Sequence, residues 1–267
     1  MQHTVTPPCE LLQVLGTSLE VQIIAGNAAL GTIVFLHEGL GSVSMWRDFP
    51  SQVCAATGCA GVVYSRQGYG QSSPAARPLP PTYMHHQAWD VLPALLLQLG
   101  IQQPILLGHS DGGTIALLYA SRFTTRNCIV MAPHLFVEDI SLHSITAARV
   151  GFETGDLRGK LAKFHSDVDG AFWQWNDVWL SDSFRSFNIE AECALITCPL
   201  LAIQGLDDPY GTMAQIDVLQ SNFNDKNSLQ SKYLLLRQLL KLEQCGHSPH
   251  RDQADAVISA VKRFLSV

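Results

Sequence analysis

The chain has 267 residues, of which 47% are hydrophobic and 15% charged, and its 17 Lys and Arg against 23 Asp and Glu give a net charge of −6. A single hydrophobic core stops growing at roughly 250–300 residues, so we expect one large domain with room for an inserted subdomain. The apolar content excludes an intrinsically disordered chain. The negative charge balance excludes a protein that mainly binds nucleic acid, because phosphates need positive partners.

The N-terminal residues MQHTVTPPCE lack the basic start and the apolar stretch of a secretory signal. No segment has the roughly 18–20 uninterrupted apolar residues of a membrane span. None of the seven cysteines falls in a Cys-x-x-Cys pair, which argues against zinc-ribbon and thioredoxin-like sites. We therefore expect a cytoplasmic protein with reduced thiols, without membrane insertion, metal or cofactor. The sequence leaves the oligomeric state open.

Along the chain, residues 10–26 alternate in polarity and predict two antiparallel strands. Short apolar runs bounded by Gly or Pro follow, and such runs are typical of strands buried on both faces. These runs are TIVFLH, GVVYSR, PILLGHS, CIVMAP and PLLAIQG. Helical spacing of apolar residues separates or follows them at 84–100, 111–123 and 254–265. The alternation predicts an α/β fold, with a mostly parallel central sheet flanked by helices.

One interval interrupts this alternation. Residues 134–198 contain no clear buried strand, although a crossover between parallel strands needs only about 12 residues. We expect a core formed by residues 1–133 and 191–267 and a helical cap over 134–190. The cap is rich in aromatic residues, which either pack inward or line an apolar substrate pocket. The candidates for the pocket are Trp173, Trp175 and Trp179.

The strongest motif is Gly108-His109-Ser110-Asp111-Gly112, between a predicted strand and a predicted helix. A Gly-x-Ser-x-Gly sequence in this context is a nucleophile elbow, a sharp turn that presents the serine at the carboxyl edge of a sheet. Glycines stand two residues on either side because neighbouring backbones approach closely there. We therefore predict that Ser110 is a nucleophile.

A serine needs a base to remove its proton and a third group to orient that base. Asp207 and Asp208 follow the strand-like run PLLAIQG, and either of them is placed to be the acid. His247 lies in a Gly-His sequence before the C-terminal helix and is the candidate base. The chain order of serine, acid and histidine is the one found in α/β hydrolases.

Acyl transfer also needs two N–H donors for the oxygen that becomes negative. One is the amide of Asp111, which follows the nucleophile. The other comes from the turn after the first buried strand, from Gly39 or its neighbour Leu40.

Taken together, the segments LHEGLGSVSMW, YSRQGYGQS, LLGHSDGGTIALLYA, PLLAIQGLDDPYG and CGHSPHRDQADAVISAVKRFL resemble the α/β-hydrolase superfamily over nearly the whole chain. The resemblance implies that the acid is Asp208, three residues after the glycine that ends its strand. It also shows a departure, because Glu38 stands where the family usually has glycine. Glu38 is therefore a candidate substrate contact, and His109, next to the nucleophile in the sequence, is another.

The sequence predicts a serine hydrolase that cleaves carboxylic esters of small, largely apolar molecules through an acyl-enzyme. Three alternatives stay open at this point. The first is hydrolysis of a C–C bond in an anionic ring-cleavage dienoate, for which Arg149, Arg158 or Arg185 in the cap is a candidate anchor. The second is hydrolysis of lactones or amides. The third is a non-catalytic binding protein that retains the hydrolase fold.

Overall fold

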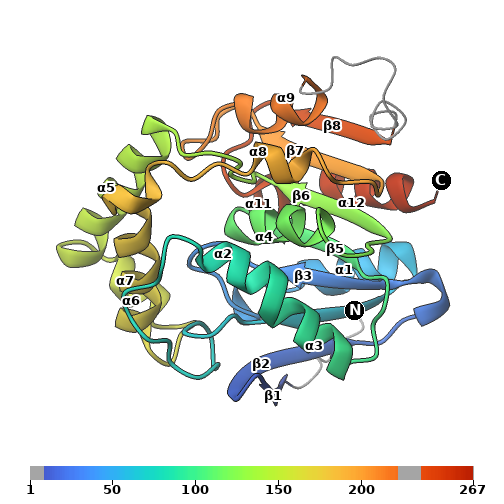
Figure 1. The fold of residues 1–267 in the computed structure, drawn as a ribbon, viewed down its shortest axis with the longest axis horizontal. Coiled ribbons are helices and arrows are strands. Elements are labelled where there is room, and N and C mark those ends of the chain that lie inside the picture. The colour runs from blue at the N-terminus through green and yellow to red at the C-terminus, as the bar shows by residue number, and fades with distance from the viewer. Residues whose placement is uncertain (1–8, 222–235, 267) are drawn as a thin grey trace.

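The computed structural model describes residues 9–221 and 236–266, and the centre of this part of the chain is a sheet of eight strands. From one edge to the other, the strand order is β1-β2-β4-β3-β5-β6-β7-β8 (Figure 1). β1–β2 and β2–β4 are antiparallel pairs, and the other pairs are parallel. The strands are β1 (Cys9–Val14), β2 (Thr17–Ile24), β3 (Thr32–Leu36), β4 (Ala60–Tyr64), β5 (Ile105–His109), β6 (Asn127–Met131), β7 (Leu200–Gly205) and β8 (Arg237–Leu242). The predicted mixed, mostly parallel sheet is confirmed.

Helices cover both faces of this sheet (Figure 1). One face packs against α1 (Phe49–Thr57) and α12 (Ala254–Leu265). The other packs against α2 (Tyr83–His86), α3 (Leu92–Gln98), α4 (Asp111–Ala120), α8 (Glu190–Cys193) and α9 (Ala214–Ser221). Shorter elements are η1 (Ala28–Leu30), η2 (Ser44–Trp46), the π-helical η3 (Gln87–Val91), η4 (Asp182–Phe184) and α11 (Pro249–Asp252).

The apolar runs of the sequence become central strands because both of their faces are covered. In β3, Ile33 and Phe35 belong to one apolar cluster, while Val34 and Leu36 belong to the other. Successive side chains of a strand point to opposite faces, so a strand between two helical layers needs apolar residues at every position. β8 shows the converse: it lies at the sheet edge, lacks a continuous apolar run, and was not predicted.

Between β6 and β7 the chain forms α5 (Asp139–Glu153), α6 (Leu157–Leu161) and α7 (Val168–Trp179), which lie together at one end of the molecule (Figure 1). Phe152 of α5 stacks on Phe172 of α7, with 3.8 Å between ring centroids. Phe172 and Trp179 share an apolar cluster with Leu36 and Ile115 of the core. These helices therefore have no separate core, and the division at 134–190 stays a prediction.

The predicted functional segments meet at the carboxyl edge of the parallel strands. The turn after β3 carries Glu38, Gly39 and Leu40; Ser110 follows β5, and Asp208 follows β7. His247 lies in the loop after β8. Within the described residues, no helix is both long and apolar enough to span a membrane.

Candidate active site

Ser110 occupies a strained turn between β5 and α4. Its φ of 53° and ψ of −120° lie outside the regions that L-residues prefer. A Cβ at Gly108 would overlap the carbonyl of Gly112, and a Cβ at Gly112 would overlap the carbonyl of Leu36. Both glycines of the motif are therefore required by close backbone contacts, as the sequence predicts.

Three side chains form a continuous chain of hydrogen bonds. His247 Nε2 lies 2.9 Å from Ser110 Oγ, and His247 Nδ1 lies 2.9 Å from both carboxylate oxygens of Asp208. Ser110 and Asp208 are buried, at 5% and 6% exposure. The imidazole is thus placed to accept the serine proton at one nitrogen while the other donates to the carboxylate.

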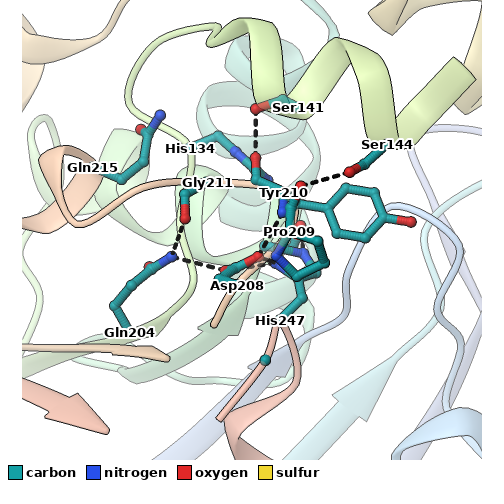
Figure 2. A network of polar contacts seen from close by, with 12 residues as sticks. His134, Ser141, Ser144, Gln204, Asp208, Pro209, Tyr210, Gly211, Gln215 and His247 are labelled. Carbon is teal, nitrogen blue, oxygen red and sulfur yellow. Dashed lines mark hydrogen bonds and ion pairs between the residues drawn. The ribbon is translucent and has the colours of Figure 1, made fainter. Parts of the chain in front are cut away.

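The surroundings of Asp208 stabilise its negative charge. Its oxygens accept hydrogen bonds from Gln204 Nε2 and from the backbone N–H of Tyr210, both at 2.8 Å (Figure 2). Burial acts to raise the pKa of Asp208, but the hydrogen bonds from His247 and Tyr210 outweigh it, and the pKa lies below its ordinary value. Asp207 is exposed. The geometry therefore favours Asp208 over its neighbour as the partner of His247.

Helix α5 contacts the loop that carries Asp208. Ser141 and Ser144 point from α5 towards this loop (Figure 2). Their hydroxyls donate to the carbonyls of Tyr210 and Pro209, at 2.5 Å in each case. Nothing in the sequence indicated these contacts. These two hydrogen bonds connect α5 to the loop that follows β7 and carries Asp208.

The opposite side of the site is the turn after β3. The N–H of Gly41 donates to the carbonyl of Glu38 at 3.1 Å, which closes a turn around Gly39 and Leu40. Arg66 donates hydrogen bonds to the backbone carbonyls of His37 and Glu38 and so stabilises this turn. Among the described residues no group accepts a hydrogen bond from the amides of Gly39 or Leu40. These amides are free to bind an oxygen atom of a ligand.

Asp111 combines a candidate oxyanion amide with a buried carboxylate. Its side chain accepts a hydrogen bond from Tyr83 at 2.6 Å and lies 3.9 Å from the guanidinium of Arg66. Trp179 Nε1 in turn donates to the Tyr83 hydroxyl at 3.1 Å. Burial raises the pKa of Asp111 although Arg66 and Tyr83 stabilise its charged form. The Asp111 carboxylate is thus held by Tyr83 and Arg66.

Glu38 lies within the site and faces two basic side chains. Its carboxylate is 3.5 Å from His109 Nδ1 and 3.5 Å from Arg251 Nη2. Burial opposes ionisation, but contacts with His109 and Arg251 hold the pKa of Glu38 well below its usual range. The carboxylate that replaces the usual glycine is therefore charged and locally paired.

A cavity of about 200 Å³ opens over Ser110. Its lining comes from the loops at the carboxyl edge of the sheet and from helices α5 and α7. The lining residues are Glu38, Gly39, Leu40, His109, Ser110, Asp111, His134, Ile145, Trp175, Trp179, Tyr210, His247 and Ser248. Sequence reasoning missed His134, Ile145 and Tyr210, which lie in no recognisable motif, and Ser248, which follows His247. Trp173, a predicted pocket residue, does not line this cavity; its ring packs on Phe152, Phe172 and Arg149. Its place on α7 turns it to another face of the helix than Trp175 and Trp179.

The three arginines of the cap interval lie outside this cavity, each beside an acidic residue. Arg149 pairs with Asp177 at 3.1 Å, Arg158 with Asp169 at 2.6 Å, and Arg185 lies 3.6 Å from Asp182. None of them lines the cavity over Ser110. An anionic substrate would therefore find no anchor among them.

Residues 33–260 match the model of the alpha/beta hydrolase family. A segment of 102 residues is 31% identical to the sn-1-specific diacylglycerol lipase ABHD11 of Mus musculus; it covers 38% of this chain and only 32% of that protein. The fold is similar to the enol-lactonase from Burkholderia xenovorans LB400, with a TM-score of 0.70 and 19% identity over 97% of this chain and 100% of that one. It is also similar to the esterase RhEst1 from Rhodococcus sp. ECU1013, with a TM-score of 0.68 and 17% identity over 98% and 99% of the two chains. The family match extends over most of the chain and includes the Ser110 turn, and the protein belongs to the alpha/beta hydrolase family.

Proposed function

We propose that this protein is a serine hydrolase that cleaves carboxylic esters of small, largely apolar molecules through an acyl-enzyme. The observation that carries the proposal is the hydrogen-bonded sequence of Ser110, His247 and Asp208 beneath a cavity with an apolar wall. A volume of about 200 Å³ suits a short acyl or alcohol group. Among the similar proteins, the names lipase and esterase describe this reaction class.

In the proposed reaction, Ser110 Oγ attacks the ester carbonyl while His247 Nε2 takes the hydroxyl proton. The carbonyl oxygen becomes negative and accepts hydrogen bonds from the amides of Asp111 and of Gly39 or Leu40. The intermediate collapses, the C–O bond to the alcohol breaks, and His247 returns the proton to the leaving alcohol. Water, deprotonated by His247, then releases the acid from Ser110. Asp208 keeps Nδ1 protonated and the ring oriented throughout.

Ser110→Ala tests this proposal directly. We expect the variant to fold normally and to lose hydrolysis of p-nitrophenyl acetate and butyrate by about 10⁴-fold or more, because removal of the nucleophile removes the acyl-enzyme route. A Ser110→Ala protein that cleaves these esters at the wild-type rate would disprove the mechanism. A fluorophosphonate probe separates the enzyme from a mere binding protein, since only an activated Ser110 becomes labelled.

C–C bond hydrolysis of a dienoate is the alternative enzymatic reaction. Its substrate is an anion, whereas the lining of the cavity includes the carboxylate of Glu38 and none of the three cap arginines. We therefore expect neutral esters to be turned over faster than a ring-cleavage dienoate. A preference for the dienoate by orders of magnitude would reverse this assignment.

A further inference from the structure

His109, the residue before the nucleophile, contacts the backbone of the proposed base. Its ring is 1% exposed and lies at the carboxyl end of β5. His109 Nε2 is 2.6 Å from the backbone carbonyl oxygen of His247. A carbonyl oxygen only accepts, so Nε2 carries a hydrogen and donates it. The turn at Ser110 thus carries the nucleophile and, through His109, also contacts the backbone of the loop that carries His247.

The His247 loop depends on such contacts because it lies beyond the end of β8. At Cys245 the carbonyl accepts from the N–H of Asp207 at 2.9 Å. At Gly246 the N–H donates to Asp252 at 2.9 Å. At residue 247 itself, the backbone contact is the one from His109. Asp208 orients the imidazole of His247, whereas His109 fixes the backbone from which that imidazole extends.

The His109 ring is also packed on its other sides. Nδ1 lies 3.5 Å from Glu38 Oε2 and makes no hydrogen bond within the described residues. The ring also packs against His250, at 4.8 Å between centroids, and against Trp46 at 6.4 Å. Rotation of the ring away from His247 would break these contacts together. The donor is therefore rigidly placed.

We infer that His109 is a positioning residue for the base. The inference rests on the proposed function, in which His247 must reach Ser110 at 2.9 Å in every turnover. A displacement of a reacting group by about 1 Å costs about 100-fold in rate. Loss of the His109 donor should therefore reduce kcat and leave KM nearly unchanged, since this bond joins two protein groups and positions the base rather than the substrate.

Three variants of the full chain separate positioning from packing. His109→Phe keeps a ring in the same space but has no donor, and we expect kcat for p-nitrophenyl butyrate to fall by about 10- to 100-fold with KM within about threefold. His109→Gln restores an N–H donor near the Nε2 position, and we expect kcat within about fivefold of wild type. His250→Phe is the control, because His250 packs in the same aromatic cluster and makes no hydrogen bond to His247. Its kcat should stay within about threefold.

Equal kcat values for His109→Phe and His250→Phe would overturn the inference, as would a His109→Gln variant as slow as His109→Phe. Should His109→Phe not fold, His109→Asn replaces it, since its shorter amide does not reach the carbonyl of His247. It is then compared with His109→Gln in the same way.

A second measurement needs no turnover and so separates this inference from the proposed function. In ¹⁵N-histidine-labelled protein, exchange of the His247 Nδ1 proton with water reports how firmly the ring is held against Asp208. We expect this exchange to be about tenfold faster in His109→Phe than in His250→Phe. Equal exchange rates would contradict positioning by His109. Absence of esterase activity in the wild-type chain would instead contradict the proposed function alone.

Discussion

The two sides of the candidate site differ in what their carboxylates contact. On the side of the base, Asp208 receives N–H groups from His247, Gln204 and Tyr210, and its charge is directed at the imidazole. On the side of the turn after β3, Glu38 and Asp111 stand next to the amides proposed to bind a negative oxygen. There, positive groups face each carboxylate: Arg251 beside Glu38, and Arg66 beside Asp111.

This difference follows from the charge that each side must stabilise. The imidazole becomes positive during the proposed reaction, so a carboxylate beside it is favourable. The carbonyl oxygen becomes negative, so an unpaired carboxylate near its donors would oppose catalysis. A carboxylate is therefore used on one side of the site, and on the other side positive groups compensate its charge.

The largest expected effect comes from the base side. Asp208→Asn should lower kcat by about 10³- to 10⁴-fold, because the amide no longer holds His247 in the required tautomer. Asp207→Asn is the matched control: its side chain is exposed, and we expect kcat within about twofold. Steady-state kinetics with p-nitrophenyl butyrate measure both. Equal losses in the two variants would show that Asp208 is not the orienting acid.

The next largest effect is expected for the ion pair of Arg66 and Asp111, and it is an effect on stability. Arg66 is buried at 2% exposure, and Arg66→Met removes the positive charge 3.9 Å from the Asp111 carboxylate and the donor of two backbone carbonyls. We expect a loss of about 3–5 kcal/mol in the free energy of unfolding, measured in urea. The double variant Arg66→Met, Asp111→Leu should regain part of this loss, because it removes the uncompensated charge. A double variant less stable than Arg66→Met would mean that the two groups are not coupled.

The stability of the fold should decrease in acid, because a histidine with a lowered pKa is buried on each side of the site. These histidines are His134 on the side of Asp208 and His250 on the side of Glu38. Burial, with His247 nearby, lowers the pKa of His134 to about 3, and burial with His109 nearby lowers that of His250 to about 2. In the unfolded chain each binds a proton near pH 6.5. Between about pH 6.5 and 3 the unfolded state therefore binds more protons, and stability falls as the pH falls.

Each of these histidines should contribute up to about 1.4 kcal/mol per pH unit to that decline. Urea unfolding at pH 7, 6 and 5 should show a shallower pH dependence in His134→Phe and in His250→Phe. His86→Gln is the control, since His86 is exposed and pairs with Asp90. A decline as steep in the His134 and His250 variants as in wild type would refute the assignment.

The smallest expected effect is a change in chain-length preference, which should differ between variants of Trp175 and Trp173. Trp175 lines the cavity and lies against Gly39, whereas Trp173 does neither. Trp175→Ala should change the ratio of kcat/KM for octanoate and butyrate esters by about 5- to 10-fold in favour of the longer chain. Trp173→Ala should leave that ratio within about twofold. A larger change in ratio from Trp173 than from Trp175 would contradict the assignment of the cavity wall.

Local patterns in the sequence sufficed wherever a single segment imposes its own geometry. Gly108 and Gly112 predicted the strained turn at Ser110, because only glycine tolerates the backbone contacts on both sides. Continuous apolar runs predicted the buried strands, since both of their faces are covered. Asp208 was predicted from its place after a strand, and His247 from its place before the C-terminal helix. The resemblance to a known family supported both.

Only the tertiary structure placed the groups that surround these residues. His134 and Tyr210 contact the His247 ring from remote segments, and Arg66 meets Asp111 across the sheet edge. No local pattern encodes such contacts, because they depend on how segments far apart in the chain pack together. The same holds for Trp173 and Trp175: helical periodicity separates their faces, but packing against the core decided which face lines the cavity.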